Sequence, residues 1–329
     1  MKIDLHAHFT PREFFNLVDS NGKRMGFDIS TDSSGQEVVS VDGVKLGPIV
    51  RQMYDPEVRI KEMDAIGLDM QAVSVPPIGF FYYLDVDKGL NLNRRQNDSI
   101  AELVRAYPDR FVGMATVPMQ DVRKAVAELE RAVTQLGFKA VEINTNVNGK
   151  NLDEPEFYPF FEKAQSLDIP IFLHPHYVIG AADRLTRNYL VNLVGNPVDT
   201  TIAVASLVLS GIMEKLPNLK LVCAHAGGTV PFIKGRWNHG YGHLYGTKLN
   251  IPKSPFEYVN RLYFDTITHY PPALRYMIND HGADHVVLGS DYPFDMADAD
   301  PISTVKNLGL NKRAEEKIMW KNAASILKL

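Results

Sequence analysis

The sequence predicts a single-domain (β/α)₈ barrel that spans residues 1–329, and two observations lead to this fold class. First, eight short apolar runs alternate with amphipathic stretches along the whole chain. Second, several of these runs are nearly continuous in Val, Ile, Leu and Phe, as parallel strands covered on both faces are. Strand–helix alternation repeated eight times favours one closed barrel over two separate domains.

Each apolar run has the length of a β-strand. In chain order the predicted strands are residues 2–9, 69–77, 111–119, 138–146, 170–176, 219–227, 261–268 and 285–294. A parallel barrel brings the carboxyl ends of all its strands to one mouth, and barrel enzymes keep their catalytic residues there.

The stretches between these strands carry helix signals. Residues 55–67 begin with Asp55 as an N-cap and Pro56 at the first helical position, and Gly67 closes the helix. Further helices are predicted at residues 120–137, 154–168, 199–217, 271–282 and 311–329.

One segment, residues 22–47, interrupts the alternation. It contains two alternating apolar and polar runs around Ser33, Ser34 and Gly35, a pattern that predicts a β-hairpin inserted after the first strand. A solvated surface hairpin accounts for the pattern as well as a functional one does, so no catalytic residue is assigned to it.

Composition excludes several classes of partner. The chain has 35 Lys and Arg against 39 Asp and Glu, and this net charge of −4 argues against a nucleic acid or an anionic membrane as the main partner. Its single cysteine, Cys223, rules out an intramolecular disulfide and fits a reducing compartment. Polar residues interrupt any signal-peptide core, and no apolar run looks long enough to cross a bilayer. We therefore expect a cytoplasmic protein.

Two histidines stand one residue apart in the first predicted strand, in "KIDLHAHFT". On a β-strand, side chains two residues apart project from the same side, so His6 and His8 converge. Ile3, Leu5 and Phe9 would then occupy the other side of the strand. A rigid pair of imidazoles indicates a metal site, which needs further ligands from elsewhere in the chain.

Three other predicted strands end in groups that can bind a metal: His174 on the fifth, His225 on the sixth and Asp291 on the eighth. Each one taken alone is better explained as a hydrogen-bonded core, rim or turn residue. Taken together these residues indicate a metal site, because a closed barrel brings their strands around to face the first strand. Neutral imidazoles and a carboxylate suit zinc and related divalent ions, and a set of three nitrogens and one oxygen leaves a position open for catalysis.

The motifs "DLHAHF", "LHPH", "AHAGG" and "GSDYPF", in this order, closely resemble the amidohydrolase superfamily. Within it they resemble the branch typified by aminocarboxymuconate-semialdehyde decarboxylase, as "DPEVRIKEMDAIGLDMQ" also does. The resemblance implies that His6, His8, His174 and Asp291 hold one divalent metal ion, zinc being expected and manganese the alternative. It also implies that His225 stays off the metal as the acid–base residue, so that His225 and Asp291 are the catalytic pair.

The resemblance further implies non-oxidative decarboxylation of an unsaturated or aromatic carboxylic acid. Arg236 matches an arginine that the family supplies to the pocket of a neighbouring subunit, which implies a homodimer. The chain departs from the family at Gly47, where the decarboxylase has an arginine, and Arg51 is a nearby substitute. This departure keeps a metal-dependent hydrolase of an amide, lactone or C–C bond as the alternative. A catalytically silent binding barrel is a third.

Four more residues are expected near the pocket. Asn144 follows the fourth strand close to the mouth, and His176 continues the fifth strand on the face of its metal-binding histidine. Phe294 and Tyr292 are expected to form an apolar wall for a planar substrate.

Two buried acids are expected to support the site rather than to react. Asp265 ends the seventh strand and is a candidate partner behind a metal ligand. Glu142 lies in the middle of the fourth strand, where a buried structural partner is more plausible than a ligand to a second metal. The site is therefore predicted to be mononuclear.

Overall fold

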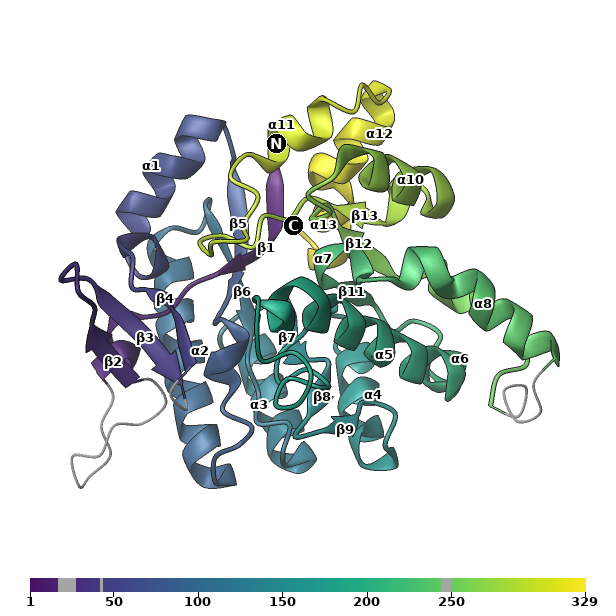
Figure 1. Cartoon of the computed structure of the whole chain (residues 1–329), viewed down its shortest axis with the longest axis horizontal. Coiled ribbons are helices and arrows are strands. Elements are labelled where there is room, and N and C mark those ends of the chain that lie inside the picture. The colour runs from purple at the N-terminus through teal and green to yellow at the C-terminus, as the bar shows by residue number, and fades with distance from the viewer. Residues whose placement is uncertain (17–27, 42–43, 244–249) are drawn as a thin grey trace.

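Eight parallel strands form the central sheet of the computed structural model, which describes residues 1–16, 28–41, 44–243 and 250–329 (Figure 1). In sheet order they are β1 (Ile3–His8), β5 (Met70–Ser74), β6 (Phe111–Ala115), β7 (Ala140–Asn144), β10 (Ile171–His174), β11 (Leu221–Cys223), β12 (Tyr263–Asp265) and β13 (Val286–Val287). Each lies within one predicted strand. The amide of Leu5 donates to the carbonyl of Leu288, and that of His8 to Tyr292, so the last strand joins the first and the barrel closes.

Helices cover the barrel. They are α1 (Pro56–Ile66), α2 (Val86–Ala106), α3 (Val122–Thr134), α4 (Tyr158–Ser166), α5 (Asn196–Leu209), α6 (Ile212–Lys215), α7 (Ala224–Gly227), α8 (Val230–His243), α9 (Pro255–Val259), α10 (Pro271–His281), α11 (Pro301–Lys306), α12 (Lys312–Glu316) and α13 (Asn322–Leu327). The predicted start and end of α1 are confirmed: the Asp55 carboxylate accepts from the amides of Glu57 and Val58, and Gly67 adopts a left-handed φ of 70°.

Helix α2 is absent from the predicted set although it has 21 residues. Its buried face includes Asn93, Gln96 and Asn97, which interrupt the apolar stripe by which a helix is recognised in sequence. The Asn97 side chain donates to the carbonyl of Thr116 and to Glu128, and the Asn93 side chain donates to the carbonyl of Phe80, so tertiary partners satisfy part of this polar face. Contacts with the rest of the protein, rather than an apolar stripe, therefore determine which face of α2 is buried.

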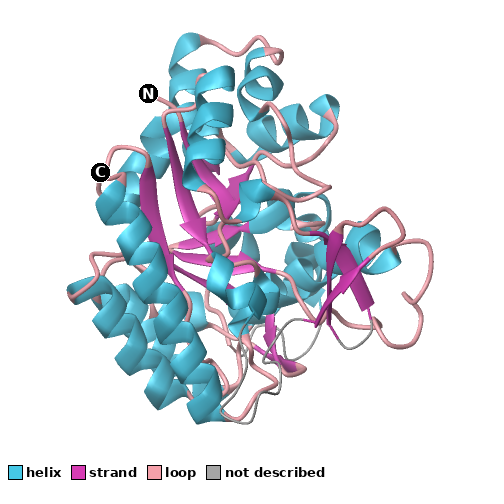
Figure 2. Cartoon of the chain, turned by 90° about the vertical axis from the view of Figure 1, so that its left-hand side faces the viewer, coloured by secondary structure: helices cyan, strands magenta, loops and turns pink. Residues whose placement is uncertain are grey.

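The segment after β1 differs from the predicted two-stranded hairpin. It forms three antiparallel strands, β2 (Asp28–Thr31), β3 (Glu37–Val41) and β4 (Val44–Pro48), which stand beside the barrel (Figure 2). The predicted turn between the first two is present, since the Asp32 carboxylate accepts from the amides of Ser34 and Gln36. Residues 22–27 and 42–43 of the prediction lie outside the described residues. The third strand was missed because β4 ends in Gly47 and Pro48, which are unfavourable for strands.

The inside of the barrel is filled by an apolar cluster from β1, β5, β6, β7, β10, β11 and β13, together with α13. Ile3 and Leu5 belong to this cluster, so the prediction that they lie opposite the two histidines is wrong. The register of β1 with β5 shifts in the middle of the strand, and such an irregularity changes which side chains point inward. His6 follows the shift and contacts Phe172 inside the barrel, with ring centroids 4.8 Å apart.

One helical run, Val191–Leu209, is long and apolar enough by length and composition to cross a membrane, which corrects the expectation that none is. It comprises the π-helical turn η5 (Val191–Gly195) and α5. Val204 and Leu207 of α5 are fully buried in the barrel's main apolar core. Packing of a core helix therefore accounts for the hydropathy of this run.

Gly113 of β6 lies where the segment between α3 and β7 packs closely on the barrel. A Cβ atom at Gly113 would lie 2.5 Å from the buried ring of Phe138. We expect Gly113→Ala to lower the free energy of unfolding by about 1–3 kcal/mol, measured by urea denaturation. The control is Gly235→Ala in α8, where nothing lies within 4 Å; it should be neutral or stabilise the protein by up to about 1 kcal/mol. Equal effects of the two substitutions would contradict this packing.

Candidate metal centre

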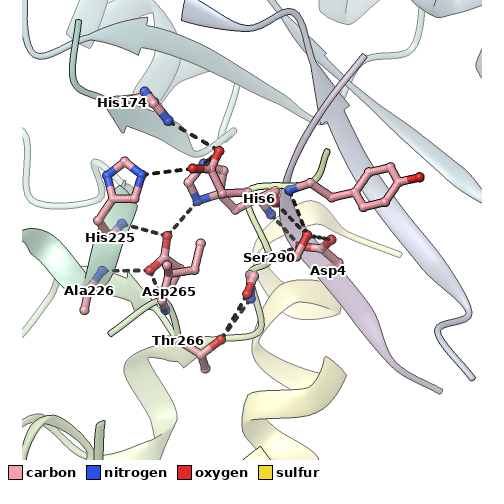
Figure 3. Close-up of polar contacts among 12 residues, drawn as sticks. Asp4, His6, His174, His225, Ala226, Asp265, Thr266 and Ser290 are labelled. Carbon is pink, nitrogen blue, oxygen red and sulfur yellow. Dashed lines mark hydrogen bonds and ion pairs between the residues drawn. The ribbon is translucent and has the colours of Figure 1, made fainter. Parts of the chain in front are cut away.

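Five side chains from four strand ends meet at one mouth of the barrel. The Oδ1 atom of Asp291 lies 3.3 Å from Nε2 of His6, 3.1 Å from Nε2 of His8 and 4.0 Å from Nε2 of His174. Its Oδ2 atom lies 3.4 Å from Nε2 of His225. Figure 3 shows the imidazoles of His6, His174 and His225 pointing toward the same place. The predicted convergence is therefore observed.

Four of the atoms that converge here have no hydrogen-bond partner although they are buried. They are Nε2 of His6, His8 and His174 and Oδ1 of Asp291. Leaving a buried polar atom unpaired costs about 1–3 kcal/mol, so four around one point require an explanation. One divalent cation would satisfy all four, and the three-nitrogen, one-oxygen set is one that such ions accept. The cluster fits a single divalent metal ion.

The charge states of these groups suit a cation. Burial alone would raise the pKa of Asp291, but the charge of His6 and the close approach of the His225, His6 and His8 imidazoles hold it well below its usual value. Burial lowers the pKa of His8 and of His174, so both are neutral. Burial also opposes charge on His6, yet the Asp291 and Asp265 carboxylates outweigh it and raise the pKa of His6 to about 10. The site thus favours positive charge beside one ionised carboxylate.

Asp265 lies directly behind His6, as predicted. Its Oδ2 atom is 2.8 Å from Nδ1 of His6 and also accepts from the backbone amide of His225 at 2.8 Å. Its Oδ1 atom accepts from the amides of Ala226 and Ile267. This arrangement fixes the His6 tautomer with Nε2 free for a metal. It also holds His225 and Ala226, whose φ angles of 53° and 56° are unfavourable without such support.

His8 has a weaker support of the same kind. Its Nδ1 atom lies 3.4 Å from the Ser74 hydroxyl, which donates to the Glu142 carboxyl group. Burial raises the pKa of Glu142 to about 8, so this group is mostly protonated at neutral pH. Glu142 is thus the buried hydrogen-bonded partner that was predicted. It also lies within reach of His8 and His174.

A polar network beneath the cluster was not found by sequence reasoning. The buried Asp4 carboxylate accepts from the Gln71 side chain at 2.9 Å and from the Ser290 hydroxyl at 2.6 Å. Arg59 of α1, fully buried, donates to the Gln71 side chain and to the carbonyl of His8. These bonds tie β1 to β5, to α1 and to the segment after β13. The signal in the sequence for this network was a charged residue, Asp4, inside the first buried strand.

A cavity of about 340 Å³ opens onto His225 and Asp291. Its walls are largely apolar and include Leu193, Phe232 and Met277. The side chains of Asn196 and Thr268 add neutral groups that can form hydrogen bonds with a ligand. None of the described residues that line this cavity is a lysine or an arginine.

The remaining expected pocket residues lie close to the cluster but outside the lining of this cavity. The Phe294 ring packs on His8 with centroids 5.4 Å apart. Asn144 is buried at the end of β7 with its Oδ1 atom unpaired, and His176 has its Nε2 atom unpaired. Tyr292 and Phe294 both line a second cavity, of about 590 Å³, which is bordered by Glu62 and Met63 of α1.

The Tyr292 side chain contacts two charged residues of α1. Its hydroxyl donates to Glu62 at 2.5 Å, and the Arg59 guanidinium lies 4.6 Å from the centre of its ring. A buried cation and a carboxylate on α1 therefore hold the ring, and its contact with a planar substrate stays a prediction.

The two arginines considered from the sequence lie outside the cavity. Arg51 forms an ion pair of 2.5 Å with Asp55, the N-cap of α1, and its side chain is exposed. Arg51 does not line the cavity, and its replacement of the arginine absent at Gly47 stays a prediction. Arg236 is exposed on α8, and within this chain it does not line the cavity.

Comparisons with known proteins agree with this geometry. The sequence profile of the family described as Amidohydrolase matches residues 3–329. The chain belongs to this amidohydrolase family.

Among relatives in this family, 2-amino-3-carboxymuconate-6-semialdehyde decarboxylase of Dictyostelium discoideum is 34% identical over 331 residues, covering 100% of this chain and 92% of that protein. Gamma-resorcylate decarboxylase of Polaromonas sp. (strain JS666 / ATCC BAA-500) is 29% identical over 342 residues, covering 100% and 98%.

Two solved structures of the family have the same fold. The 5-carboxyvanillate decarboxylase from Sphingomonas paucimobilis has a TM-score of 0.85 and 26% identity, covering 100% of this chain and 99% of that one. The dihydroxybenzoic acid decarboxylase from Polaromonas sp. JS666, with bound manganese and the inhibitor 2-nitroresorcinol, has a TM-score of 0.83 and 25% identity, covering 100% and 97%.

Asp265 should control metal affinity through His6. In Asp265→Asn the neutral amide no longer supports the imidazole electrostatically, and we expect zinc and manganese affinity to fall about 10–100-fold. Competition of the protein with a fluorescent chelator measures this affinity. The control, Asp109→Asn, changes an exposed carboxylate in the turn before β6 and should leave affinity unchanged. Equal affinities in the wild type and Asp265→Asn would contradict the support described above.

Proposed function

We propose that this protein is a metal-dependent non-oxidative decarboxylase of an unsaturated or aromatic carboxylic acid. The observation that carries the proposal is the set of four buried, unpaired ligand atoms beside His225, at the end of a largely apolar cavity. The names of the relatives support it, since two curated proteins and two solved structures at 25–34% identity are all decarboxylases of conjugated or aromatic acids.

We assign metal binding to His6, His8, His174 and Asp291, whose converging atoms lack other partners. Bound there, a divalent ion supplies a Lewis acid that polarises an oxygen atom of the substrate. Zinc is our first choice because imidazole and carboxylate ligands suit it, and manganese is the alternative because a structural relative contains it.

We assign proton transfer to His225. When the bond from carbon to the carboxylate breaks, carbon dioxide leaves and the bonding electrons pass into the conjugated system; one proton must then reach that carbon. His225 lines the cavity, and its Nε2 atom faces the Asp291 carboxylate. An imidazole in this place can deliver the proton, a contribution of about 10²–10⁴-fold in rate. His225 also lies within 4.8 Å of the His6, His174 and Asp291 ligand atoms, so its role must be tested directly.

The cavity walls suit the body of such an acid. Leu193, Phe232 and Met277 offer apolar surface to a planar ring or diene, while Asn196 and Thr268 can hydrogen-bond ring substituents. Phe294, Asn144 and His176 lie around the cluster and are proposed to contact the substrate beside the metal. Their positions next to the ligands support this set of contacts.

We also propose a homodimer in which Arg236 of each subunit reaches the substrate of the other. The exposure of Arg236 on α8 and the match to the family's arginine support this proposal. A cytoplasmic location is proposed because Cys223, the only cysteine of the chain, is a buried free thiol.

Release of carbon dioxide tests the reaction. Protein loaded with zinc or manganese should convert at least one of three acids, 2,6-dihydroxybenzoate, 5-carboxyvanillate or 2-amino-3-carboxymuconate-6-semialdehyde, with one equivalent of carbon dioxide for each product. Chelator-treated protein is the control and should be inactive. Incorporation of solvent oxygen into a product without carbon dioxide would instead indicate the hydrolase.

Two substitutions separate the assigned roles. Asp291→Ala removes a ligand and should abolish both metal binding and turnover. His225→Ala should retain one equivalent of metal, measured by elemental analysis, while kcat falls about 10²–10⁴-fold. Loss of the metal from His225→Ala would show that this histidine is a ligand and that the assigned roles are wrong.

A further inference from the structure

Two segments, one after β10 and one after β13, both contribute to the walls of the cavity. The first runs from the end of β10 to α5 and carries Asn192 and Leu193, which line the cavity. The second follows β13 and carries the Asp291 ligand and Met296, which also lines the cavity. The width of the substrate space therefore depends on how these two segments are held together.

One side-chain contact joins the two segments. The Tyr189 hydroxyl lies 3.1 Å and 3.3 Å from the two oxygens of the Asp295 carboxylate, to which it donates. Tyr189 is three residues before Asn192, and Asp295 immediately precedes Met296. The hydrogen bond thus lies next to a lining residue on each wall. Burial and the nearby Asp295 charge raise the pKa of Tyr189 to about 12, so the hydroxyl keeps its proton.

The backbone at this contact adopts an unfavourable conformation. Asn188 and Tyr189 have φ angles of 55° and 58°, the left-handed region that residues other than glycine rarely occupy. Successive left-handed residues need contacts that hold them in place, and such residues gather at ligand sites. The π-helical turn η5 begins directly afterwards, at Val191, and this rare geometry is also common at functional sites.

The wall next to the contact has little other support. The side chain of Leu193 is 52% exposed and that of Val194 is 43% exposed, so half of this turn faces solvent rather than packed neighbours. Where packing is sparse, a single hydrogen bond has a large share in holding a segment.

We propose that Tyr189 and Asp295 form a latch that closes the substrate cavity, acting as positioning residues that set substrate affinity rather than the rate of the chemical step. The proposal rests on the proposed function in one respect, namely that this cavity binds the acid. The substrate body would lie between Leu193 and Met296, and the latch would hold these two walls against it.

Tyr189→Phe removes only the hydroxyl and tests the latch. We expect KM for a turned-over acid, and Kd for the unreactive probe 2-nitroresorcinol on manganese-loaded protein, to rise about three- to ten-fold. This effect is smaller than that of a buried hydrogen bond to a charged group, because the contact is partly exposed to solvent. The metal content and kcat should not change. Tyr107→Phe, at the end of α2 and away from the mouth, is the matched control.

Variants of Asp295 complete the test. Asp295→Ala should match Tyr189→Phe, and the double variant should lose no more than either single variant, as expected for one shared interaction. Asp295→Asn keeps an acceptor oxygen and should recover part of the affinity. Unchanged KM and Kd in Tyr189→Phe, or fully additive losses in the double variant, would overturn the latch.

Hydrogen exchange separates this proposal from the proposed function. Amides of residues 180–195 should exchange faster in Tyr189→Phe than in the wild type and in Tyr107→Phe, whether or not any acid is turned over. Faster exchange without release of carbon dioxide from any acid would support the latch and contradict the decarboxylase. Release of carbon dioxide, with unchanged exchange and unchanged KM in Tyr189→Phe, would support the decarboxylase and contradict the latch.

Discussion

Closure of the barrel between β1 and β13 is the constraint on which the site depends. The amide of Asp291 donates to the carbonyl of His6 at 2.8 Å, so the last strand delivers its carboxylate directly against the first strand's histidine pair. His174 and His225 follow because β10 and β11 continue the same closed sheet. Without this closure the ligand atoms would belong to an open sheet whose edges lie far apart.

Buried carboxyl groups hold the imidazoles of the cluster in a fixed orientation. Asp265 supports His6, Glu142 supports His8 through Ser74, and Asp4 ties the first strand to its neighbours. The ionised groups surround the imidazoles with negative charge, which offsets the burial that would otherwise keep a cation out. Hydrogen bonds fix each ring so that one nitrogen faces the common point. A preorganised metal centre needs this second layer as much as its ligands.

The cavity, rather than the metal centre, determines which acids can bind. Its apolar walls suit the body of the conjugated acid that we propose as substrate, and they lie beside His225, to which we assign proton delivery. Parts of these walls come from the segments after β10 and β13, so the same loops that carry the ligands also shape the substrate space. Affinity and chemistry can therefore be altered separately although they share the same segments.

The sequence by itself determined the eight strands and the five converging side chains, because parallel strands in a barrel must end at one mouth and polar residues there follow buried apolar runs. Only the tertiary structure decided the rest. The register shift in β1 that turns His6 inward, the Asp4–Arg59 network and the Tyr189–Asp295 contact each join residues far apart in the chain. Local periodicity carries no information about such partners, since their energies arise only when the closed fold brings them within hydrogen-bonding distance.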